Sequence, residues 1–297
     1  MLTHLLERPE KPSRAVILGA QGFVARNLAE VLERDQIGCR RVGRGEVDLT
    51  APGAAEKLAG ILAPSDAVVM TSALTPDKGR DPATLMLNLR MAEAVGAAML
   101  PGRCAQLVYV SSDAVYDWRS PLIHEESSAE PLDLYAVMHI ARERMLGHCC
   151  GAARIPYAVV RPCAIYGAGD THNSYGPNRF LRTARAEGKI RLFGEGEEQR
   201  DHVWVRDVAE ILKLCLLHRS TGVVNAVSGK SVSFREAAQR IAPLAGRAVQ
   251  IELAPRGSPV THRHFDITSL ARAFPAFQPT PLAQGLAQMA AAMSRVL

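Results

Sequence analysis

A short apolar run that leads through a glycine turn into an amphipathic stretch is the sequence feature that most constrains the fold. Residues 15–18 are followed by the pattern Gly19-x-x-Gly22-x-x-Ala25 and then by residues 26–34, whose apolar side chains recur on one helical face. This pattern predicts a strand, a tight turn and a helix. A strand that enters a helix in this way opens a βαβ unit, whose second strand runs parallel to the first.

The same alternation continues as far as residue 160. Extended segments are predicted at 38–42, 67–71, 106–111 and 157–160, and helices at 54–62, 82–100 and 133–150. Strands that alternate with helices are joined by right-handed crossovers, which place the strands in one parallel sheet with helices on both faces. The predicted fold class is therefore α/β, a doubly wound parallel sheet of the Rossmann type.

The glycine turn also predicts a ligand. Glycines let the backbone approach a pyrophosphate closely, and the helix N-terminus offers unpaired N–H groups and the positive end of its dipole. We therefore expect a dinucleotide cofactor at this turn. The residues expected to contact it are Gly19, Gln21, Gly22, Phe23 and Val24.

The residues after the second strand bear on which dinucleotide binds. NAD binders carry an acid there for the ribose 2′-hydroxyl, but residues 39–44 include none, and Arg44 is suited to a 2′-phosphate. Asp48 and Leu49 follow, where an acid would bind the adenine amino group. The sequence predicts NAD or NADP, tightly bound, and Arg44 favours NADP.

The amino-acid composition changes in the second half of the chain. After residue 162 the sequence turns to loops dense in Gly, Asn and Pro, which predict a smaller C-terminal substrate-binding lobe, and residues 203–217 predict a strand and a helix that rejoin the main sheet. The predicted division assigns 14–164 and 200–226 to the dinucleotide-binding domain. The remaining segments, 165–199 and 227–297, form the substrate-binding lobe.

Composition excludes several other classes. The net charge of +5 comes from scattered arginines, so nucleic acid is not an expected partner, and no window of about 18 uncharged apolar residues suggests a membrane span. The six cysteines include no C-x-x-C pair, which predicts reduced thiols in a cytoplasmic protein. His262 and His264 have no acid or cysteine at ligand spacing, so no metal is expected.

Several short motifs occur in the order and spacing of a known family. They are Gly19-x-x-Gly22-x-x-Ala25, Ser111-Ser112-Asp113-Ala114-Val115-Tyr116, Tyr135-x-x-x-His139, Arg161-Pro162-x-x-Ile165-Tyr166-Gly167 and Gly194-x-Gly196-x-x-x-Arg200-Asp201. Together they resemble the extended short-chain dehydrogenase/reductase superfamily, and within it the NAD-dependent epimerase/dehydratase family that acts on nucleotide sugars. The resemblance covers nearly the whole chain. It implies an enzyme with a small-molecule nucleotide-sugar substrate, and a homodimer formed through helices 82–100 and 133–150.

The resemblance also implies roles for residues outside the glycine turn. Asn88 matches the position of the family's active-site asparagine. The cofactor is expected to contact Ala73, Asn88, Tyr135, His139, Arg161 and Pro162, and the substrate Tyr166, Asn178 and Arg200. Arg200 would clamp the diphosphate, because a guanidinium offers a fork of donors matched to phosphate oxygens.

The family's chemistry uses a tyrosine as acid/base, a serine or threonine that hydrogen-bonds the reacting oxygen, and a lysine four residues beyond the tyrosine. Ser112 and Tyr135 fill the first two roles, but the lysine position holds His139, and no lysine lies between residues 78 and 189. A neutral histidine assists a phenolate weakly. Three interpretations remain: the site keeps His139 protonated, the enzyme works slowly or at higher pH, or the fold binds cofactor without turnover.

The residues beside Ser112 bear on the reaction. Dehydratases of the family carry Thr-Asp-Glu where this chain has Ser112-Asp113-Ala114, and elimination of water needs both an acid and a base. Hydride transfer at one sugar carbon is therefore expected, with Tyr135 as the acid/base and Asp113 in the catalytic set. Residues 192–201 favour an epimerase, Arg44 and Asp113 favour an NADPH-dependent keto-sugar reductase, and the missing lysine favours a dinucleotide-binding sensor without turnover.

Overall fold

A seven-stranded sheet forms the centre of the computed structural model, which describes residues 1–100 and 102–294. Its strand order is β1-β10-β6-β5-β4-β2-β3, and every neighbouring pair is parallel except β1 with β10. The strands are β1 (Thr3–His4), β2 (Arg14–Leu18), β3 (Cys39–Val42), β4 (Asp66–Met70), β5 (Gln106–Val110), β6 (Tyr157–Pro162) and β10 (Ser220–Ala226). The predicted doubly wound α/β fold is confirmed.

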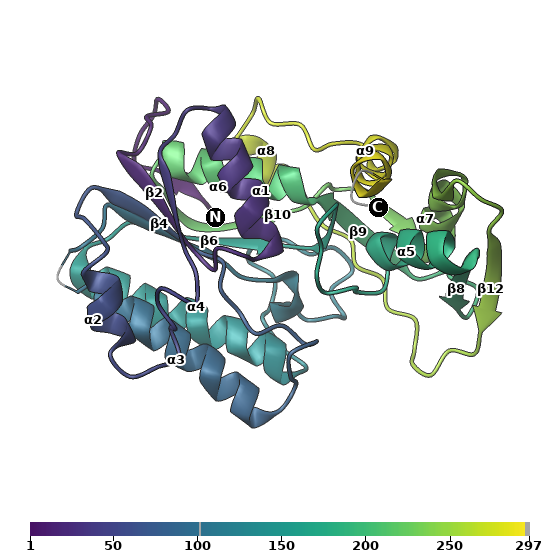
Figure 1. Ribbon diagram of the computed structural model, residues 1–297, viewed down its shortest axis with the longest axis horizontal. Coiled ribbons are helices and arrows are strands. Elements are labelled where there is room, and N and C mark those ends of the chain that lie inside the picture. The colour runs from purple at the N-terminus through teal and green to yellow at the C-terminus, as the bar shows by residue number, and fades with distance from the viewer. Residues whose placement is uncertain (101, 295–297) are drawn as a thin grey trace.

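Helices cover both faces of this sheet (Figure 1). One face carries α1 (Phe23–Arg34), α6 (Val205–Leu217) and α8 (Thr268–Ala273), and the other carries α2 (Ala54–Ala59), α3 (Pro82–Ala98) and α4 (Leu134–Ala153). Asp81 and Asp133 cap α3 and α4, each accepting a hydrogen bond from a backbone N–H of the first turn, which satisfies groups that the helix leaves unpaired. Within the described residues, no helix is long and apolar enough to cross a membrane.

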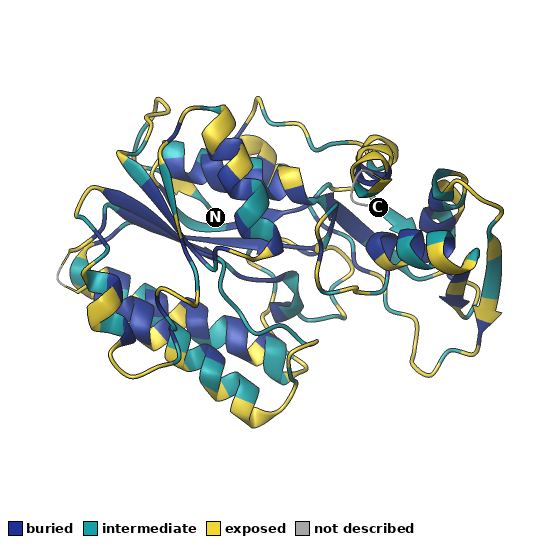
Figure 2. Ribbon diagram, viewed as in Figure 1, coloured by how far each residue is buried: buried dark blue, intermediate teal, exposed yellow. Residues whose placement is uncertain are grey.

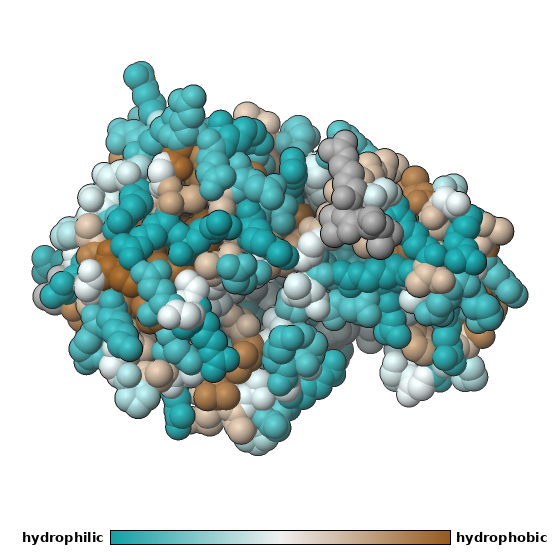
Figure 3. Space-filling model, in the orientation of Figure 1, coloured by the Kyte–Doolittle hydropathy of each residue, from teal (hydrophilic) through white to brown (hydrophobic). Residues whose placement is uncertain are grey.

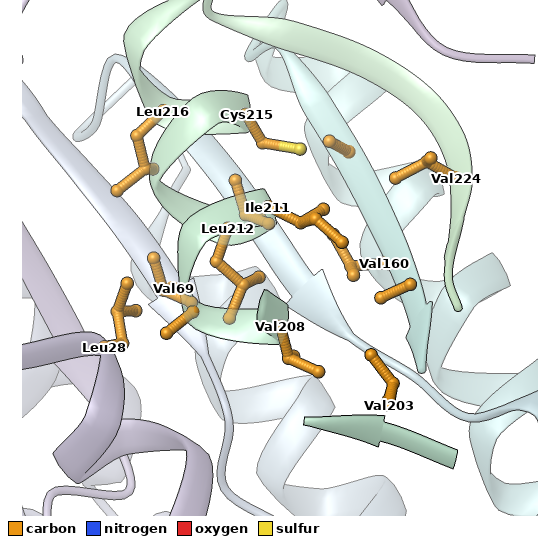
Figure 4. Close-up of a cluster of buried hydrophobic side chains, with 14 of the residues drawn as sticks. Leu28, Val69, Val160, Val203, Val208, Ile211, Leu212, Cys215, Leu216 and Val224 are labelled. Carbon is orange, nitrogen blue, oxygen red and sulfur yellow. The ribbon is translucent and has the colours of Figure 1, made fainter. Parts of the chain in front are cut away.

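The core follows from apolar strands that are buried on both faces. The central strands β2, β4, β5 and β6 are almost wholly buried, as the dark blue ribbons show (Figure 2). On one face, Val208, Ile211 and Leu212 of α6 pack towards Val69 and Val160 of the sheet (Figure 4). Such near-continuous apolar runs are typical of parallel strands covered on both sides.

The strand order reverses between β2 and β4. From β2 the chain passes to β3 on one side and then returns to β4 on the other side. Ligands of open α/β sheets bind at such a point, beyond the carboxyl ends of the strands. The glycine turn after β2 and the loop after β4 meet at this edge of the sheet.

The smaller lobe contains two short sheets and three helices. A three-stranded sheet consists of β7 (Ala164–Tyr166), β9 (Gln199–Trp204) and β11 (Ser231–Ser233), and a two-stranded sheet of β8 (Lys189–Phe193) and β12 (Gln250–Ala254). The helices are α5 (Pro177–Glu187), α7 (Phe234–Ile241) and α9 (Leu282–Ser294), and a 3₁₀ turn, η2 (Ala242–Ala245), follows α7. A second 3₁₀ turn, η1 (Asp113–Val115), follows β5 in the larger lobe. The space-filling view shows an indentation between the two lobes (Figure 3).

The strand predicted at Val203 does not rejoin the main sheet, and this prediction was wrong. The strand lies in β9, which pairs with β7 and β11 in the smaller lobe. The main sheet is extended instead by β10, which pairs in parallel with β6. The chain turns away from the main sheet after β6, and the next strand, β7, lies in the smaller lobe. There β7 pairs in parallel with β9, which is why β9 does not join the main sheet.

Part of the C-terminal segment packs away from the smaller lobe. Phe265, Leu270 and Phe274 belong to the same buried cluster as the main sheet and α6. We therefore retain the two-lobe division as a proposal, with residues 265–277 assigned to the larger lobe.

Candidate active site

The glycine turn has the geometry that a phosphate group requires. Gly19 has a φ of +99°, and a Cβ there would lie 2.9 Å from Oγ1 of Thr71 and 3.0 Å from the backbone of Ser72. Gly22 caps α1 without a side-chain hydrogen bond, and no acid lies in the first turn of the helix. The N–H groups of Gly19, Ala20 and Gly22 donate to backbone carbonyls, so an anion would meet the unpaired N–H groups at the start of α1.

The other predicted residues of the turn contribute mainly backbone. Gln21 is exposed and Val24 is half-buried. Phe23 and Ala25 are buried, and the ring of Phe23 packs beneath Gly167. The Phe23 side chain thus anchors the turn, and the backbone N–H of Phe23 is the group that can reach a phosphate.

The residues expected to contact the adenosine part of the cofactor interact with one another. The Arg44 side chain is 80% exposed and pairs with Asp48, with Nε 2.9 Å from Oδ2. Asp48 also accepts hydrogen bonds from the backbone and hydroxyl of Thr50, and together these contacts lower the pKa of Asp48 to about 2. Leu49 is buried in the core. Arg44 is therefore free to turn towards a ligand, whereas Leu49 supports the loop from beneath.

Asn88 holds the loop that follows β4. Its Oδ1 accepts a hydrogen bond from the N–H of Leu74 at 2.9 Å, and its Nδ2 donates to the Leu74 carbonyl at 3.0 Å and to the Thr84 carbonyl at 3.1 Å. The amide is thereby fully occupied by protein. Asn88 positions the loop, and the adjacent half-buried Ala73 lies where a cofactor would pass.

Ser112 and Tyr135 come together from two elements. Ser112 follows the carboxyl end of β5 and caps η1, its Oγ accepting a hydrogen bond from the Ala114 N–H at 3.1 Å. Tyr135 lies in the first turn of α4. Burial raises the pKa of Tyr135 to about 12, and the nearby Ser112 hydroxyl opposes this rise. The hydroxyl and the phenol thus share one site beyond the sheet edge.

His139 is buried and neutral. Its ring lies edge-on to Tyr135, with the ring centroids 4.6 Å apart, and its Nδ1 is 2.7 Å from the hydroxyl of Tyr109. Burial and the positive charge of Arg142 hold the pKa of His139 well below its usual range, which argues against a protonated His139. Among the described residues its buried Nε2 has no hydrogen-bond partner, so a ribose hydroxyl of a bound dinucleotide fits there.

Asp113 is held beside an arginine. Its Oδ2 lies 3.2 Å from Nε of Arg263, whose guanidinium stacks 4.4 Å from the centre of the Trp118 ring. Burial raises the pKa of Asp113, and the charges of Arg263 and Arg200 oppose the rise. The carboxyl group is therefore committed to an ion pair behind Ser112.

Arg200 lines a cavity of about 420 Å³ in the smaller lobe. Its guanidinium pairs with Glu198 and donates to Oγ1 of Thr261 at 3.1 Å. Arg256 contacts the other oxygen of Glu198 at 2.7 Å. The remaining wall is largely aromatic, formed by Tyr175, Phe193 and Phe234. Two guanidinium groups and aromatic faces suit a nucleoside diphosphate.

The side chains of four residues predicted to contact a ligand are engaged by other parts of the protein. Arg161 forms a bidentate ion pair with Glu143, with Nε 2.9 Å from Oε1 and Nη2 2.6 Å from Oε2. Both side chains are buried between β6 and α4. Pro162 ends β6 opposite Ala226 and is buried in the sheet.

Tyr166 and Asn178 likewise serve the fold of the smaller lobe. Tyr166 is buried, and its hydroxyl lies against Gly285 of α9, where a Cβ would come within 1.9 Å of it. Asn178 is buried at the start of α5, and its Oδ1 accepts a hydrogen bond from the Gly167 N–H at 3.0 Å. These two side chains fasten α9 and the loop after β7.

Sequence reasoning missed four charged residues of the site. They are Arg142 beside His139, Arg263 beside Asp113, and Glu198 and Arg256 beside Arg200. Arg142 carried a signal, because it follows His139 by three residues and Tyr135 by seven, which places all three on one helix face. Arg256 and Arg263 come from loops, where spacing gives no such signal.

Comparison with known proteins identifies the family. Residues 15–227 match the family model described as the NAD dependent epimerase/dehydratase family. The chain belongs to this family. Its cofactor is therefore NAD or NADP, and the family predicted from the motifs is confirmed.

Solved structures share the fold over nearly the whole chain. A GDP-L-fucose synthetase from Naegleria fowleri has a TM-score of 0.86 at 15% identity, covering 99% of this chain and 97% of that chain. A UDP-N-acetylglucosamine 4-epimerase from Methanobrevibacter ruminantium M1 has 0.84 at 18%, covering 97% and 100%. RMD from Pseudomonas aeruginosa, complexed with NADPH, has 0.81 at 23%, covering 96% and 100%. At these identities the likeness shows the fold alone.

Proposed function

We propose that this chain is an NAD(P)-dependent nucleotide-sugar epimerase that works by hydride transfer at one sugar carbon. The observation that carries the proposal is the meeting of Ser112 with Tyr135 beyond the carboxyl end of β5. The glycine turn follows the carboxyl end of β2 in the same parallel sheet. Acid/base pair and dinucleotide site therefore lie at one edge of the sheet.

The chain's own residues account for the proton transfers. The bound nicotinamide would accept a hydride from the sugar carbon and return it to the opposite face of the resulting ketone. Tyr135, as phenolate, would take the hydroxyl proton while the oxygen electron pair forms the carbonyl bond, and would give the proton back when hydride returns. Ser112 would hydrogen-bond the same oxygen throughout. The cycle is balanced, since one proton and one hydride leave and return.

Elimination of water is disfavoured by the residues around Ser112. Ala114 stands where the dehydratases that the chain resembles carry a glutamate. The neighbouring Asp113 is held by Arg263. Among residues 1–100 and 102–294, neither position beside Ser112 therefore offers a free carboxyl group to protonate a leaving hydroxyl.

A keto-sugar reductase is the second candidate, and Arg44 favours it. Its side chain is 80% exposed at the end of β3, where a 2′-phosphate of NADP would lie. A reductase would use exchangeable NADPH, and Tyr135 would donate a proton once instead of recovering it.

Incubation of the purified protein with UDP-, GDP- and dTDP-sugars tests the proposal. Conversion without net consumption of cofactor supports the epimerase, consumption of added NADPH supports the reductase, and saturable cofactor binding without conversion supports the sensor. For the active substrate we expect Tyr135→Phe and Ser112→Ala to lower kcat by about 10²- to 10⁴-fold, the size of general acid/base catalysis, with cofactor binding retained.

Tyr157→Phe is the matched control for these variants. Its hydroxyl donates to the Glu143 carbonyl at 3.3 Å, away from Ser112, and we expect normal turnover. Full activity in Tyr135→Phe would refute the assignment of the acid/base. A homodimer through α3 and α4 stays a prediction; Met86 and Val137, which are exposed on these helices, are suited to it.

A further inference from the structure

Arg142 is a buried cation without an acidic partner. Its side chain is fully buried, and within residues 1–100 and 102–294 it forms no ion pair. The other buried basic side chains are paired: Arg161 with Glu143, Lys213 with Asp35, and Arg263 with Asp113. A buried charge without a counter-charge costs free energy. Packing alone is therefore a poor explanation for an arginine at this position.

The position of Arg142 directs its charge towards the acid/base. It follows Tyr135 by seven residues on α4, and two helical turns bring both residues to one face. Long side chains in helices lean back towards the N-terminus, and Arg142 contacts the Sδ of Met138, which lies four residues before it, at 3.6 Å. The guanidinium thus lies on the Tyr135 side of its own Cα.

An unbroken set of contacts joins the guanidinium to Tyr135. The Arg142 guanidinium lies 5.0 Å from the centre of the Tyr109 ring. The Tyr109 hydroxyl lies 2.7 Å from Nδ1 of His139, and the His139 ring packs edge-on against Tyr135. Arg142 also donates from Nη2 to the Ser72 carbonyl at 2.7 Å, which places its charge beside the loop that the cofactor would pass.

We propose that the buried guanidinium of Arg142 supplies the positive charge that stabilises the Tyr135 phenolate, the role that the family gives to a lysine at the position of His139. The proposal rests on the proposed function of Tyr135 as acid/base. Arg142 is a positioning residue in this scheme, because it acts on Tyr135 through the electric field and through the His139 ring. It also explains how the chain can dispense with lysine between residues 78 and 189.

The charges around Tyr135 agree with this assignment. Burial has the largest effect on the pKa of Tyr135 and raises it, the Ser112 hydroxyl and the charge of Arg142 lower it, and Asp113 and Asp133 raise it. His139 is neutral and adds no charge. An arginine stays protonated at any pH at which the protein is folded. Titratable and charged groups face Tyr135 from four parts of the chain. They are Asp133, His139 and Arg142 at the N-cap and within α4, Asp113 of η1, Tyr109 of β5, and Arg80 and Asp81 before α3.

The pH profile of kcat tests the proposal. The rate constant kcat should rise with pH as Tyr135 ionises, and we expect Arg142→Met to move the midpoint of this rise upward by about one pH unit. Below the midpoint, kcat should therefore fall about tenfold. A unit charge roughly 10 Å away in a medium of effective dielectric about 20 has an effect of this size. Arg142→Lys, which keeps the charge, should leave the midpoint near that of the wild type. Arg144→Met, an exposed neighbour on α4, is the matched control and should not move it.

A double variant separates charge from structure. His139→Lys should restore the midpoint in the Arg142→Met background, because it returns one positive charge to the neighbourhood of Tyr135. An equal loss of kcat at every pH in Arg142→Met, with an unmoved midpoint, would overturn the proposal. So would an equal shift in Arg142→Lys.

A titration without turnover separates this proposal from the proposed function. The near-ultraviolet phenolate absorbance of the protein with saturating NAD⁺, minus that of Tyr135→Phe, follows Tyr135 alone. Arg142→Met should raise its midpoint by about one pH unit. If no nucleotide sugar is converted, the proposed function fails, but this titration still tests whether Arg142 stabilises the Tyr135 phenolate. An unchanged midpoint refutes Arg142 even in an active enzyme.

Discussion

Replacement of Gly19 by alanine tests the dinucleotide site at its most constrained atom. The φ of +99° lies where L residues rarely occur, and a left-handed conformation costs about 1–2 kcal/mol for a residue with a Cβ. The new Cβ would also lie 2.9 Å from Oγ1 of Thr71 and 3.0 Å from Cα and N of Ser72. Two of these neighbours are backbone atoms of the loop after β4, so the loop or the turn must move.

The magnitude follows from these contacts. The free variant can relieve this strain by leaving the conformation that receives the phosphates. Binding must then restore the strained conformation at a cost of about 1–2 kcal/mol, which raises the Kd for NAD or NADP about 5- to 30-fold. Displacement of the Ser72 loop adds to this loss. We therefore expect a Kd at least tenfold higher, by calorimetric titration with each dinucleotide. Strain that the free turn does not relieve appears instead as a lower unfolding free energy in urea, by at most about 1–2 kcal/mol.

Gly45→Ala is the matched control for this experiment. Gly45 lies in the loop after β3, and a Cβ there would have no neighbour within 4 Å. This variant should bind both dinucleotides as the wild type does. Wild-type affinity in Gly19→Ala would refute the reasoning, because the phosphates would then not depend on the close approach of this turn.

Two further predictions concern buried charges. Glu143→Gln should lower the unfolding free energy by about 3–5 kcal/mol, because it leaves the Arg161 guanidinium buried without its partner; a loss below about 1 kcal/mol in urea unfolding would contradict the ion pair. His202 is buried with both ring nitrogens unpartnered in the described chain, and burial lowers its pKa to about 4. Its folded pKa lies below the unfolded value of about 6.5, so His202 makes the protein less stable as pH falls below that value. Relative to the wild type, His202→Phe should gain about 2 kcal/mol between pH 7.5 and pH 5, with packing differences cancelling, and an unchanged difference would contradict this.

The sequence predicted the fold well because the fold depends on local periodicity. Alternating apolar runs and amphipathic helices specify the parallel sheet, and the glycine turn marks its first crossover. The nearness of Ser112 to Tyr135 could also be anticipated, since the carboxyl end of β5 and the start of α4 lie at the same sheet edge. Both inferences need only the order of elements along the chain.

Side-chain partners were harder to predict, because they depend on which face of an element a residue occupies. Arg161 was expected at the cofactor, but its side chain meets Glu143 of α4 instead. Tyr166 was expected at the substrate, but it packs beneath Gly285 of the last helix. Both partners are distant or on separate elements, and motif spacing carries no information about them.

The glutamate that separates two arginines in the smaller lobe has a consequence for selectivity. Arg200 and Arg256 share Glu198, and Arg256 also lies 3.5 Å from Glu197, so internal carboxylates offset much of the positive charge of the free cavity. An incoming anion must exchange places with an internal carboxylate, and a small ion such as chloride or orthophosphate recovers too few donors to do so. A ligand that reaches both guanidinium groups at once can complete the exchange. If this cavity holds the diphosphate of the proposed substrate, it would select by the reach of an anion as well as by its charge.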